Sequence, residues 1–336
     1  MKATAVAPSN IAFIKYWGKA DEALRIPLNA SISMNLSSAY TTTTVEFSNL
    51  YKTDEVYLTP SSETYKHSRP LEFVGSEKKR IIEHVDRIRK NAGIHTRAKI
   101  VTRNTFPHGA GIASSASGFA ALTVAACKAA GVTLSEKELT IIARLGSGSA
   151  CRSIPDGFVL WEKGKISSES YAYSLYPADF WDVRDILVIV DFGLKKVSTS
   201  DGMKLVSTSP LWKTRVAGVP SKVTKMKTAF AEKDFTSLGE LIEEDCLDMH
   251  HVMQTQIPPV FYWSDMTKQI TKAVGDWRTA GLSVYFTVDA GPNVHLIVEG
   301  KDELEVLEKL KNFPGVLQVI VNKPAPGAHQ INDHLF

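Results

Sequence analysis

The chain has 336 residues, of which 44% are hydrophobic and 22% charged. This composition is typical of one large or two packed globular domains. Its formal net charge of +3 is too small to indicate binding to nucleic acid or a membrane surface, although a local positive pocket for an anionic small molecule is compatible with it.

The cysteines and the apolar segments indicate the compartment. No stretch reaches about 18 uncharged apolar residues, the length that spans a bilayer, and the first residues lack the apolar run of a signal peptide. Three widely spaced cysteines, Cys127, Cys151 and Cys246, fit no disulfide framework. We therefore expect a cytoplasmic protein with reduced thiols.

The first half of the chain mixes predicted strands and helices. The threonine-rich stretch Ala39–Phe47 favours a strand, and the polar segment Asn49–Pro70 indicates a hairpin or an irregular connection. Apolar residues at helical spacing predict a helix over Glu77–Asn91, and a strand follows at Ala98–Thr102.

An alanine-rich helix is then expected over Gly118–Ala130. Ser135, with Glu138 three residues later, is typical of a capping box at the start of the next helix. Phe158–Trp161 and Ile186–Val190 have the composition of buried strands.

The second half predicts helices packed on an antiparallel sheet. Pro210–Met249 is mostly helical in pattern, with a break expected at Pro220. The remaining expected elements are a helix at Thr267–Ala280, strands at Val284–Val288 and Val294–Val298, a helix at Glu303–Phe313 and a last strand at Val316–Val321. This is an α+β arrangement, and we place a domain boundary near residue 185, which divides the chain into 1–185 and 186–336.

A glycine- and serine-rich segment, GAGIASSASG at residues 109–118, lies between a predicted strand and a predicted helix. Helix N-termini offer unpaired N–H groups to phosphates, and glycine lets the backbone approach them closely. From context alone, phosphate binding and a plain helix cap remain equal alternatives. The segment is neither a P-loop nor a G-x-G-x-x-G motif.

Read from Pro107, the order P-x-x-x-G-x-x-S-S resembles the ATP-binding motif of the GHMP kinase superfamily. Ile112-Ala113 before the serines resembles one branch of it, the mevalonate diphosphate decarboxylases. Four further segments are similar to motifs of that branch, in the same order along the chain: residues 10–19 (NIAFIKYWGK), 146–153 (GSGSACRS), 195–203 (KKVSTSDGM) and 289–293 (DAGPN).

The resemblance implies a GHMP kinase fold, with an N-terminal half like domain 2 of ribosomal protein S5, a ferredoxin-like C-terminal half and the active-site cleft between them. It implies ATP-dependent decarboxylation of mevalonate 5-diphosphate to isopentenyl diphosphate, through phosphorylation of the 3-hydroxyl. It also implies ATP and Mg²⁺ as cofactors and a homodimer.

The resemblance also assigns residues. Asp289 is the expected base at the 3-hydroxyl, Lys15 its neighbour, and Arg152 the bidentate partner of the substrate carboxylate. The implied substrate contacts are Asn10, Tyr16, Trp17, Gly18, Lys19, Lys78, Ser147, Gly148, Ser149, Ala150, Cys151, Arg152 and Ser200. Lys79 is an alternative to Lys78. The implied ATP contacts are Gly109, Ala110, Gly111, Ala113, Ser114, Ser115, Ser117, Ser198 and Thr199, with Ser115 also expected at the magnesium ion.

Three other functions remain as alternatives at this point. A phosphomevalonate decarboxylase would act on the monophosphate, and the tail PAPGAH at residues 324–329 is similar to that group. A mevalonate 3-kinase would phosphorylate and stop, but that group lacks the pair formed here by Lys15 and Asp289. A non-catalytic sensor on the same fold would have lost Asp289 or the loop serines.

Overall fold

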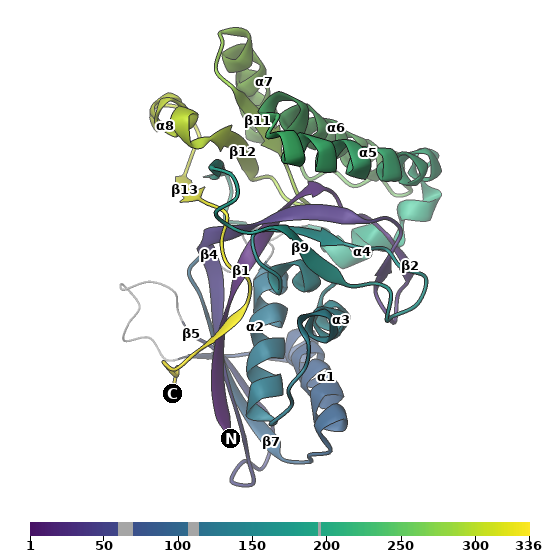
Figure 1. The fold of residues 1–336 in the computed structure, drawn as a ribbon, viewed down its shortest axis with the longest axis vertical. Coiled ribbons are helices and arrows are strands. Elements are labelled where there is room, and N and C mark those ends of the chain that lie inside the picture. The colour runs from purple at the N-terminus through teal and green to yellow at the C-terminus, as the bar shows by residue number, and fades with distance from the viewer. Residues whose placement is uncertain (60–69, 107–113, 194–195) are drawn as a thin grey trace.

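The computed structural model describes residues 1–59, 70–106, 114–193 and 196–336, which form two sheets covered by helices (Figure 1). The larger sheet belongs mainly to the N-terminal half. Its strands are β1 (Lys2–Ile14), β4 (Ser31–Ser48), β5 (Glu55–Thr59), β6 (Leu71–Glu72), β7 (Arg97–Asn104), β8 (Phe158–Trp161), β9 (Ala172–Tyr176) and β14 (His329–Ile331). Their order is β14-β1-β4-β7-β5-β6, with β8 and β9 attached to β4.

The long pair β1 and β4 carries the chain from the sheet to the middle of the molecule. The two strands pair antiparallel from Lys2 opposite Glu46 to Ile14 opposite Ile32, with irregularities after Pro8 and after Ala12. Such irregularities bend a strand, and both strands curve toward the C-terminal half in Figure 1. A small hairpin of β2 (Lys19–Asp21) and β3 (Ile26–Pro27) follows β1.

Three helices cover one face of this sheet: α1 (Gly75–Ala92), α2 (Ser114–Ala129) and α3 (Glu136–Gly146). The alanines of α2 pack against the small residues of β1 in one apolar core, because small side chains let helix and sheet approach closely. The capping box predicted at Ser135 is confirmed, since its side chain accepts from Glu138 N and the Glu138 side chain accepts from Ser135 N.

The second sheet has the antiparallel order β11-β12-β10-β13. Its strands are β10 (Val183–Ile189), β11 (Val284–Thr287), β12 (Val294–Glu299) and β13 (Gln318–Asn322). Its helices are α4 (Thr199–Lys204), α5 (Trp212–Glu232), α6 (Phe235–Thr255), α7 (Asp265–Thr279) and α8 (Glu303–Lys311). Along the chain the order is a strand, helices, two strands, a helix and a strand, and the first strand, β10, lies in the middle of the sheet. This is the predicted ferredoxin-like pattern.

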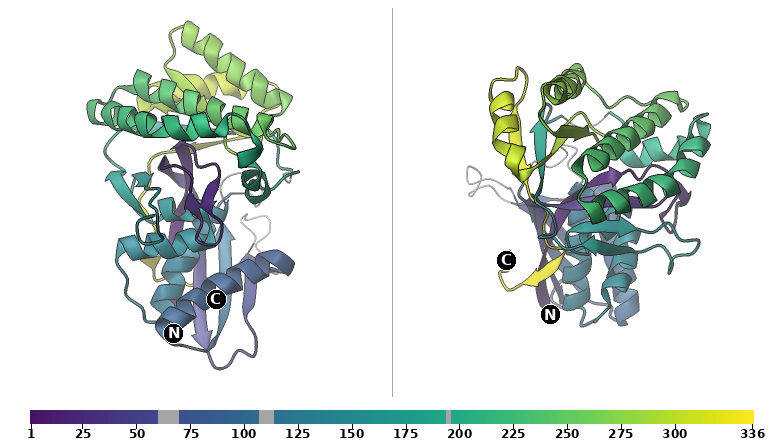
Figure 2. Two further views of the ribbon diagram at one scale, coloured as in Figure 1. Left: turned by 90° about the vertical axis from the view of Figure 1, so that its right-hand side faces the viewer. Right: turned by 45° about the horizontal axis from the view of Figure 1, so that its top comes forward.

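The two halves share an apolar core. Phe13 of β1 and Ile32 of β4 belong to the same buried cluster as Phe230 of α5 and Leu238 of α6. Figure 2 shows α5 and α6 lying across the ends of these strands. Because a broad apolar contact resists sliding, the residues that follow β1 are held in place against the C-terminal helices.

The last residues return to the first sheet. Beyond β13, Ala325 N donates to Asn35 O at 3.2 Å, and β14 then pairs antiparallel with Thr4 to Val6 of β1. The two termini lie close together in Figure 1, and Lys2 Nζ donates to Phe336 O at 3.0 Å. The division near residue 185 stays a prediction, with β10 crossing that position.

Three expectations about elements were wrong or incomplete. Helix α5 runs unbroken through Pro220, because the proline lies on the exposed side while Val219 and Met226 are buried. The segment Asn49–Pro70 contains β5, which pairs antiparallel with β6 just beyond the segment, as the hairpin alternative requires, and also parallel with β7, which was not expected. Its residues 60–69 lie outside the described part. The strand β1 was not predicted.

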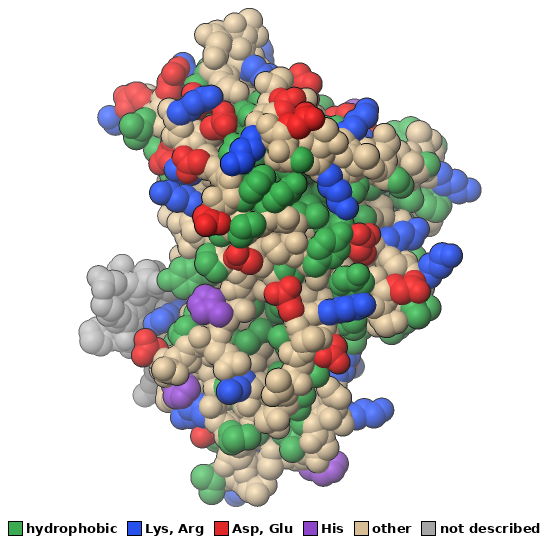
Figure 3. All heavy atoms as spheres, viewed as in Figure 1, with side chains coloured by type: hydrophobic (Ala, Val, Ile, Leu, Met, Phe, Trp, Pro, Cys, Tyr) green, Lys and Arg blue, Asp and Glu red, His purple; other side chains and the backbone are tan. Residues whose placement is uncertain are grey.

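On the face shown in Figure 3, acidic and basic side chains are interspersed. Among the described residues, no helix combines the length and the apolar character that crossing a bilayer requires.

Candidate active site

A cavity of about 490 Å³ lies between the two halves of the molecule. The N-terminal half contributes the residues after β1, the starts of α1 and α2, and a 3₁₀ helix, η2 (Gly148–Ser153). The C-terminal half contributes α4, one turn of α6 and the residues after β11. The lining residues are Ala12, Lys15, Tyr16, Trp17, Lys19, Arg25, Glu77, Arg80, Ser114, Ser115, Ser147, Gly148, Ser149, Arg152, Ser198, Thr199, Ser200, Met203, Met249, Asp289 and Ala290.

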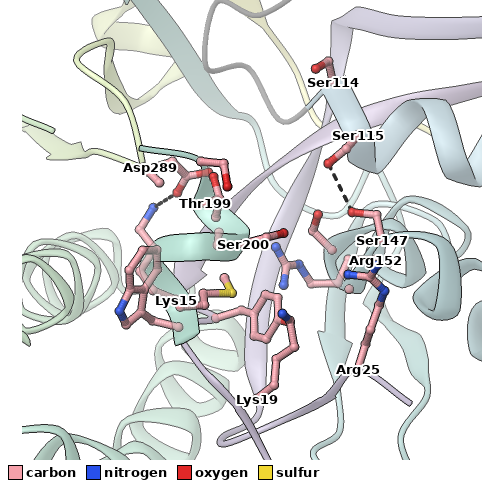
Figure 4. Close-up of a pocket in the computed structure, with 18 of the residues that line it drawn as sticks. Lys15, Lys19, Arg25, Ser114, Ser115, Ser147, Arg152, Thr199, Ser200 and Asp289 are labelled. Carbon is pink, nitrogen blue, oxygen red and sulfur yellow. Dashed lines mark hydrogen bonds and ion pairs between the residues drawn. The ribbon is translucent and has the colours of Figure 1, made fainter. Parts of the chain in front are cut away.

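Lys15 and Asp289 meet across the cavity from opposite halves of the chain (Figure 4). The Lys15 Nζ lies 2.5 Å from Asp289 Oδ1; the lysine is 1% exposed and the carboxylate 28%. Burial is the largest single influence and raises the pKa of Asp289, but the charge and hydrogen bond of Lys15 act with other nearby charges to lower the net pKa. His295 and Arg152 add to the lowering. The carboxylate is therefore ionised at neutral pH and reachable from the cavity.

Arg152 is a buried guanidinium held by neutral partners. Its Nη1 donates to Ser31 Oγ at 2.8 Å, and its Nε and Nη2 donate to Asn10 Oδ1 at 3.2 and 3.0 Å. Burial lowers the pKa of Arg152. Asn10 does not line the cavity, so its expected direct contact with substrate is not supported; it orients Arg152 instead. A buried cation with neutral neighbours favours an incoming carboxylate.

Tyr16 and Gly148 form one wall together. A Cβ on Gly148 would lie 2.8 Å from Tyr16 Oη and Cε1. The tyrosine ring therefore leaves room only for glycine at position 148. The same ring also contacts Trp161 edge-on, with centroids 4.7 Å apart. Among the described residues, the Tyr16 hydroxyl is buried without a hydrogen-bond partner. An unpaired buried hydroxyl is costly, which fits a donor kept for a ligand.

Two arginines that the motifs did not indicate lie at the same wall. Arg25 Nε donates to Leu145 O at 3.1 Å, and Arg80 donates to Gly146 O from Nε and Nη2 at 3.1 and 2.9 Å. Burial, with help from the charge of Arg25, lowers the pKa of Arg80 to about 10. The carboxylate of Glu77, on the same helix as Arg80, acts on the Arg80 pKa in the opposite direction. Two such cations side by side favour a polyanion.

The position predicted for Lys78 needs correction. The Lys78 ammonium pairs with Glu72 at 2.6 Å and does not line the cavity, while Lys79 pairs with Glu83 at 3.9 Å. Arg80, on the same helix, is the basic residue that reaches the cavity. Arg80 lies three residues after Glu77, which also lines the cavity. Because residues at this spacing share a helix face, the sequence could have identified Arg80 as a candidate for the site.

The serines line both sides of the opening. Ser115 Oγ lies 3.1 Å from Ser147 Oγ, which connects the start of α2 to η2 (Figure 4). Thr199 and Ser200 lie on α4 opposite them. Ser198 caps this helix, since its Oγ accepts from Asp201 N at 3.1 Å.

Several predicted contacts do not line the cavity. Ser117 instead pairs with Thr41 Oγ1 at 2.7 Å and fastens α2 to β4. Gly18 adopts a φ of 96° and packs against Leu28 and Val206, while Ala150 and Cys151 are fully buried within η2. Gly109, Ala110, Gly111 and Ala113 lie outside the described residues.

A second, apolar pocket of about 250 Å³ adjoins the cavity, and the two share Glu77, Arg80, Ser114 and Ser115. Its walls come from the large sheet and from α2, and its apolar lining includes Val56, Leu58, Phe73, Ile81, Ile100, Phe119 and Leu122. The arrangement offers a flat apolar site next to a polar one that carries serines and a guanidinium.

Two sheets with a cleft between them, serines at a helix start and cations at the opposite wall define an enzyme of the GHMP kinase fold. The N-terminal model of the diphosphomevalonate decarboxylase-like proteins matches residues 7–172, and the mevalonate 5-diphosphate decarboxylase C-terminal model matches residues 186–327. The chain belongs to the diphosphomevalonate decarboxylase family.

Individual relatives agree with this assignment. Diphosphomevalonate decarboxylase of Debaryomyces hansenii is 36% identical over 90% of this chain and 81% of its own length. Mevalonate diphosphate decarboxylase from Staphylococcus aureus is 39% identical over 98% of both chains, with a TM-score of 0.91. A complex of the protein MDDEF with MVAPP, AMPPCP and magnesium is 37% identical over 99% of both chains, with a TM-score of 0.89. These relatives carry the name of the diphosphate substrate, as the main prediction requires, and not that of the monophosphate alternative.

Proposed function

We propose that the chain converts mevalonate 5-diphosphate and ATP into isopentenyl diphosphate, ADP, phosphate and CO₂. The observation that carries the proposal is the Lys15–Asp289 pair at 2.5 Å, which opens into the same cavity as Arg152. Mevalonate 3-kinases, which stop after phosphorylation, lack this pair. A non-catalytic sensor would have no need for it.

Asp289 accepts the proton of the tertiary 3-hydroxyl as that oxygen attacks the γ-phosphorus of ATP. Its lowered pKa ensures that it is ionised, and the geometry of a buried, charge-paired carboxylate suits a positioned base. Lys15, whose ammonium is buried beside it, stabilises negative charge that develops on the hydroxyl oxygen. ADP leaves, and the substrate then carries a phosphate at C3.

Arg152 holds the carboxylate at the other side of the reacting carbon. When the C3–phosphate bond breaks, the phosphate departs with its electron pair, and the electrons of the bond to the carboxylate form the new double bond. CO₂ is released. Since negative charge leaves the carboxylate in this step, Arg152 contributes by orienting the group through its planar fork more than by stabilising the product.

The diphosphate of the substrate is assigned to the wall formed by Tyr16, Lys19 and η2. Arg25 and Arg80 join the substrate contacts implied by the resemblance, and Lys78 is no longer one of them. Lys19 is nearly buried and pairs with Glu22 at 2.7 Å. Ser147, Gly148 and Ser149 offer hydroxyl and backbone donors at the start of η2. Trp17 and Gly18, together with Ala150 and Cys151, support this wall through packing. Several donors are needed because a diphosphate carries about three negative charges.

The nucleotide is assigned to the part of the cavity lined by Ser114 and Ser115 and to the apolar pocket that adjoins it. The adenine ring fits the apolar walls, and the phosphates then reach Ser114 and Ser115 at the start of α2, where helix N–H groups favour anions. Ser198, Thr199 and Ser200 supply hydroxyls from α4. The residues of the loop before α2 are proposed as further ATP contacts from the sequence alone.

A magnesium ion fits this site as a companion of the nucleotide. The described residues contain no cluster of three His, Cys, Asp or Glu side chains that could hold a metal by themselves. The hydroxyl of Ser115 would be the protein ligand, and the ion would neutralise charge on the ATP phosphates. This agrees with the magnesium and AMPPCP bound together in the MDDEF complex.

We also propose a homodimer in the cytoplasm. The dimer rests on the family resemblance, and the compartment on the three free cysteines, all of which are buried. Light scattering coupled to size exclusion tests the dimer, and an elution mass near 36.9 kDa would contradict it.

The activity is tested by offering ATP with mevalonate, its 5-phosphate or its 5-diphosphate in separate assays. We expect ADP, phosphate and CO₂ together, and only with the diphosphate. ADP without CO₂ would identify a kinase. CO₂ from the 5-phosphate would identify the monophosphate enzyme, and no nucleotide hydrolysis with any of the three would indicate a sensor.

A further inference from the structure

Lys15 and Asp289 both lie just beyond the end of a strand. Lys15 is the first residue after β1, and Asp289 is separated from the end of β11 by Val288 alone. Strand pairing therefore does not fix the backbone at these positions. In each case helix α6 supplies at least one side chain that hydrogen-bonds the backbone at or beside these positions.

On the Lys15 side, both backbone groups are bound by charged or amide side chains. Lys15 N donates to Asp245 Oδ2 at 2.6 Å. Lys15 O accepts from Arg215 Nη2 at 3.2 Å and from Asn29 Nδ2 at 3.0 Å. Arg215 also binds both oxygens of Asp245, at 3.1 and 2.9 Å. All of these side chains are buried, Asp245 completely.

On the Asp289 side, the next turns of α6 hold the preceding residue. Val288 N donates to Cys246 Sγ at 3.2 Å, and His250 Nε2 lies 3.1 Å from Val288 O. Burial lowers the pKa of His250 to about 4, so the ring is neutral and its Nε2–H donates to that carbonyl. One helix thus binds the backbone beside both members of the pair.

We propose that Asp245 and Arg215 are positioning residues for Lys15, and that α6 is the common support which sets Lys15 against Asp289 for turnover. The inference rests on the proposed roles of Lys15 and Asp289. Neither Asp245 nor Arg215 lines the cavity, so their effect on the reaction passes through the Lys15 backbone. A buried ion pair adds little net stability compared with apolar residues of similar size, so we assign to this pair a positioning role rather than a stabilising one.

The pH profile reports the position of Lys15. The groups that face Asp289 are Lys15 after β1, Arg152 of η2, His295 of β12, and His250 and Cys246 of α6. Of the charges that lower the pKa of Asp289, Lys15 is the strongest. When Lys15 moves away, that pKa rises. Activity that requires the ionised carboxylate is then lost at a higher pH as the solution is acidified.

The test replaces the ion pair by apolar residues, in the double variant Asp245→Leu/Arg215→Met. We expect kcat to fall by about tenfold to a hundredfold, as for small misplacements of reacting groups. We expect KM for both substrates to stay nearly constant, and the acid limb of the kcat/KM profile to move to higher pH. Wild-type kcat with a wild-type acid limb would overturn the proposal.

The matched control is Glu243→Leu/Arg278→Met. Glu243 is also on α6, pairs with Arg278 at 2.8 Å and accepts a backbone hydrogen bond, from Phe286 N at 3.0 Å. That site has no contact with Lys15 or Val288. We expect a change in melting temperature at most, with kcat and the acid limb as in the wild type. An equal fall of kcat and an equal movement of the limb would show a general packing effect and overturn the proposal.

A milder variant covers the case in which the double variant does not fold. Asn29→Ala removes one donor to Lys15 O and one acceptor of Arg215 Nη1, but keeps both charged side chains of the Asp245–Arg215 pair. We therefore expect a smaller fall in kcat with the same direction of the acid limb. Unchanged kinetics would again count against the proposal. Lys15→Met and Asp289→Asn test the proposed function separately from the role of α6. If these two variants retain turnover, the proposed function is wrong. If they lose turnover while Asp245→Leu/Arg215→Met and Asn29→Ala keep it, only the role of α6 is wrong.

Discussion

Gly148→Ala is the sharpest steric test of the wall assigned to the diphosphate. The new methyl carbon would lie 2.8 Å from Tyr16 Cε1 and Oη and 2.9 Å from Cζ, whereas ordinary contacts begin near 3.4 Å. The ring must therefore shift by roughly half an ångström or more. Trp161 also packs against this ring, with centroids 4.7 Å apart, which limits how far the ring can move. Overpacking of this kind costs about 1–3 kcal/mol of folding free energy.

We expect Gly148→Ala to lower the melting temperature and to reduce kcat/KM for the diphosphate substrate by about tenfold, since displacements of this size at a binding group are costly. Tyr16→Phe separates the two effects. It removes a buried hydroxyl that has no partner among the described residues, so it should weaken substrate binding without loss of stability.

Gly275→Ala, in the interior of α7, is the control, because beyond the adjacent residues and the helix's own backbone no atom lies within 4 Å of the added carbon. Here alanine should stabilise the protein by up to about 1 kcal/mol through its higher helix propensity, with unchanged kinetics. Thermal unfolding and steady-state assays on the three variants decide the matter. A Gly148→Ala protein with wild-type melting temperature and kcat/KM would refute the packing argument and the placement of Tyr16.

The other predictions concern the chemistry of the cavity. Asp289→Asn should lower kcat by about a hundredfold or more while KM changes little, because a positioned base is lost; a loss below about tenfold in steady-state assays would remove the base assignment. Arg152→Lys should raise KM for the mevalonate substrate, because a point charge replaces a fork, and unchanged KM and kcat would exclude Arg152 from the carboxylate site. Arg80→Ala should raise KM for the diphosphate whereas Lys78→Ala should not, and the reverse result would restore the assignment made from sequence.

The sequence contained enough information to predict the second sheet and its chain order. Apolar strands and amphipathic helices alternate there with clear turn residues, and Ser135 with Glu138 marks a helix start in a few letters. Strand β1 was missed because Ala3, Ala5 and Ala7 have no strand preference of their own; they are buried because α2 packs on them. Tertiary packing likewise overrides the local effect of Pro220.

The motifs brought Lys15, Arg152 and Asp289 to attention as separate segments, but not the network that connects them. Asn10 was expected to touch substrate, but its side chain binds Arg152. A motif cannot show whether a side chain faces a cavity or a neighbouring arginine. Arg25 gives no local signal at all: it lies after β2 with a φ of 52°, and only the fold brings it beside Arg80. Roles that depend on such long-range contacts could not be read from one sequence.

The return of the C-terminal residues to β1 has a consequence for biosynthesis. β14 covers the edge of β1 at Thr4 to Val6, although more than 300 residues separate the two in the chain. During translation the first sheet therefore emerges long before its own edge strand, and exposed strand edges promote pairing with other chains. The nascent chain carries this unprotected edge until β14 has left the ribosome.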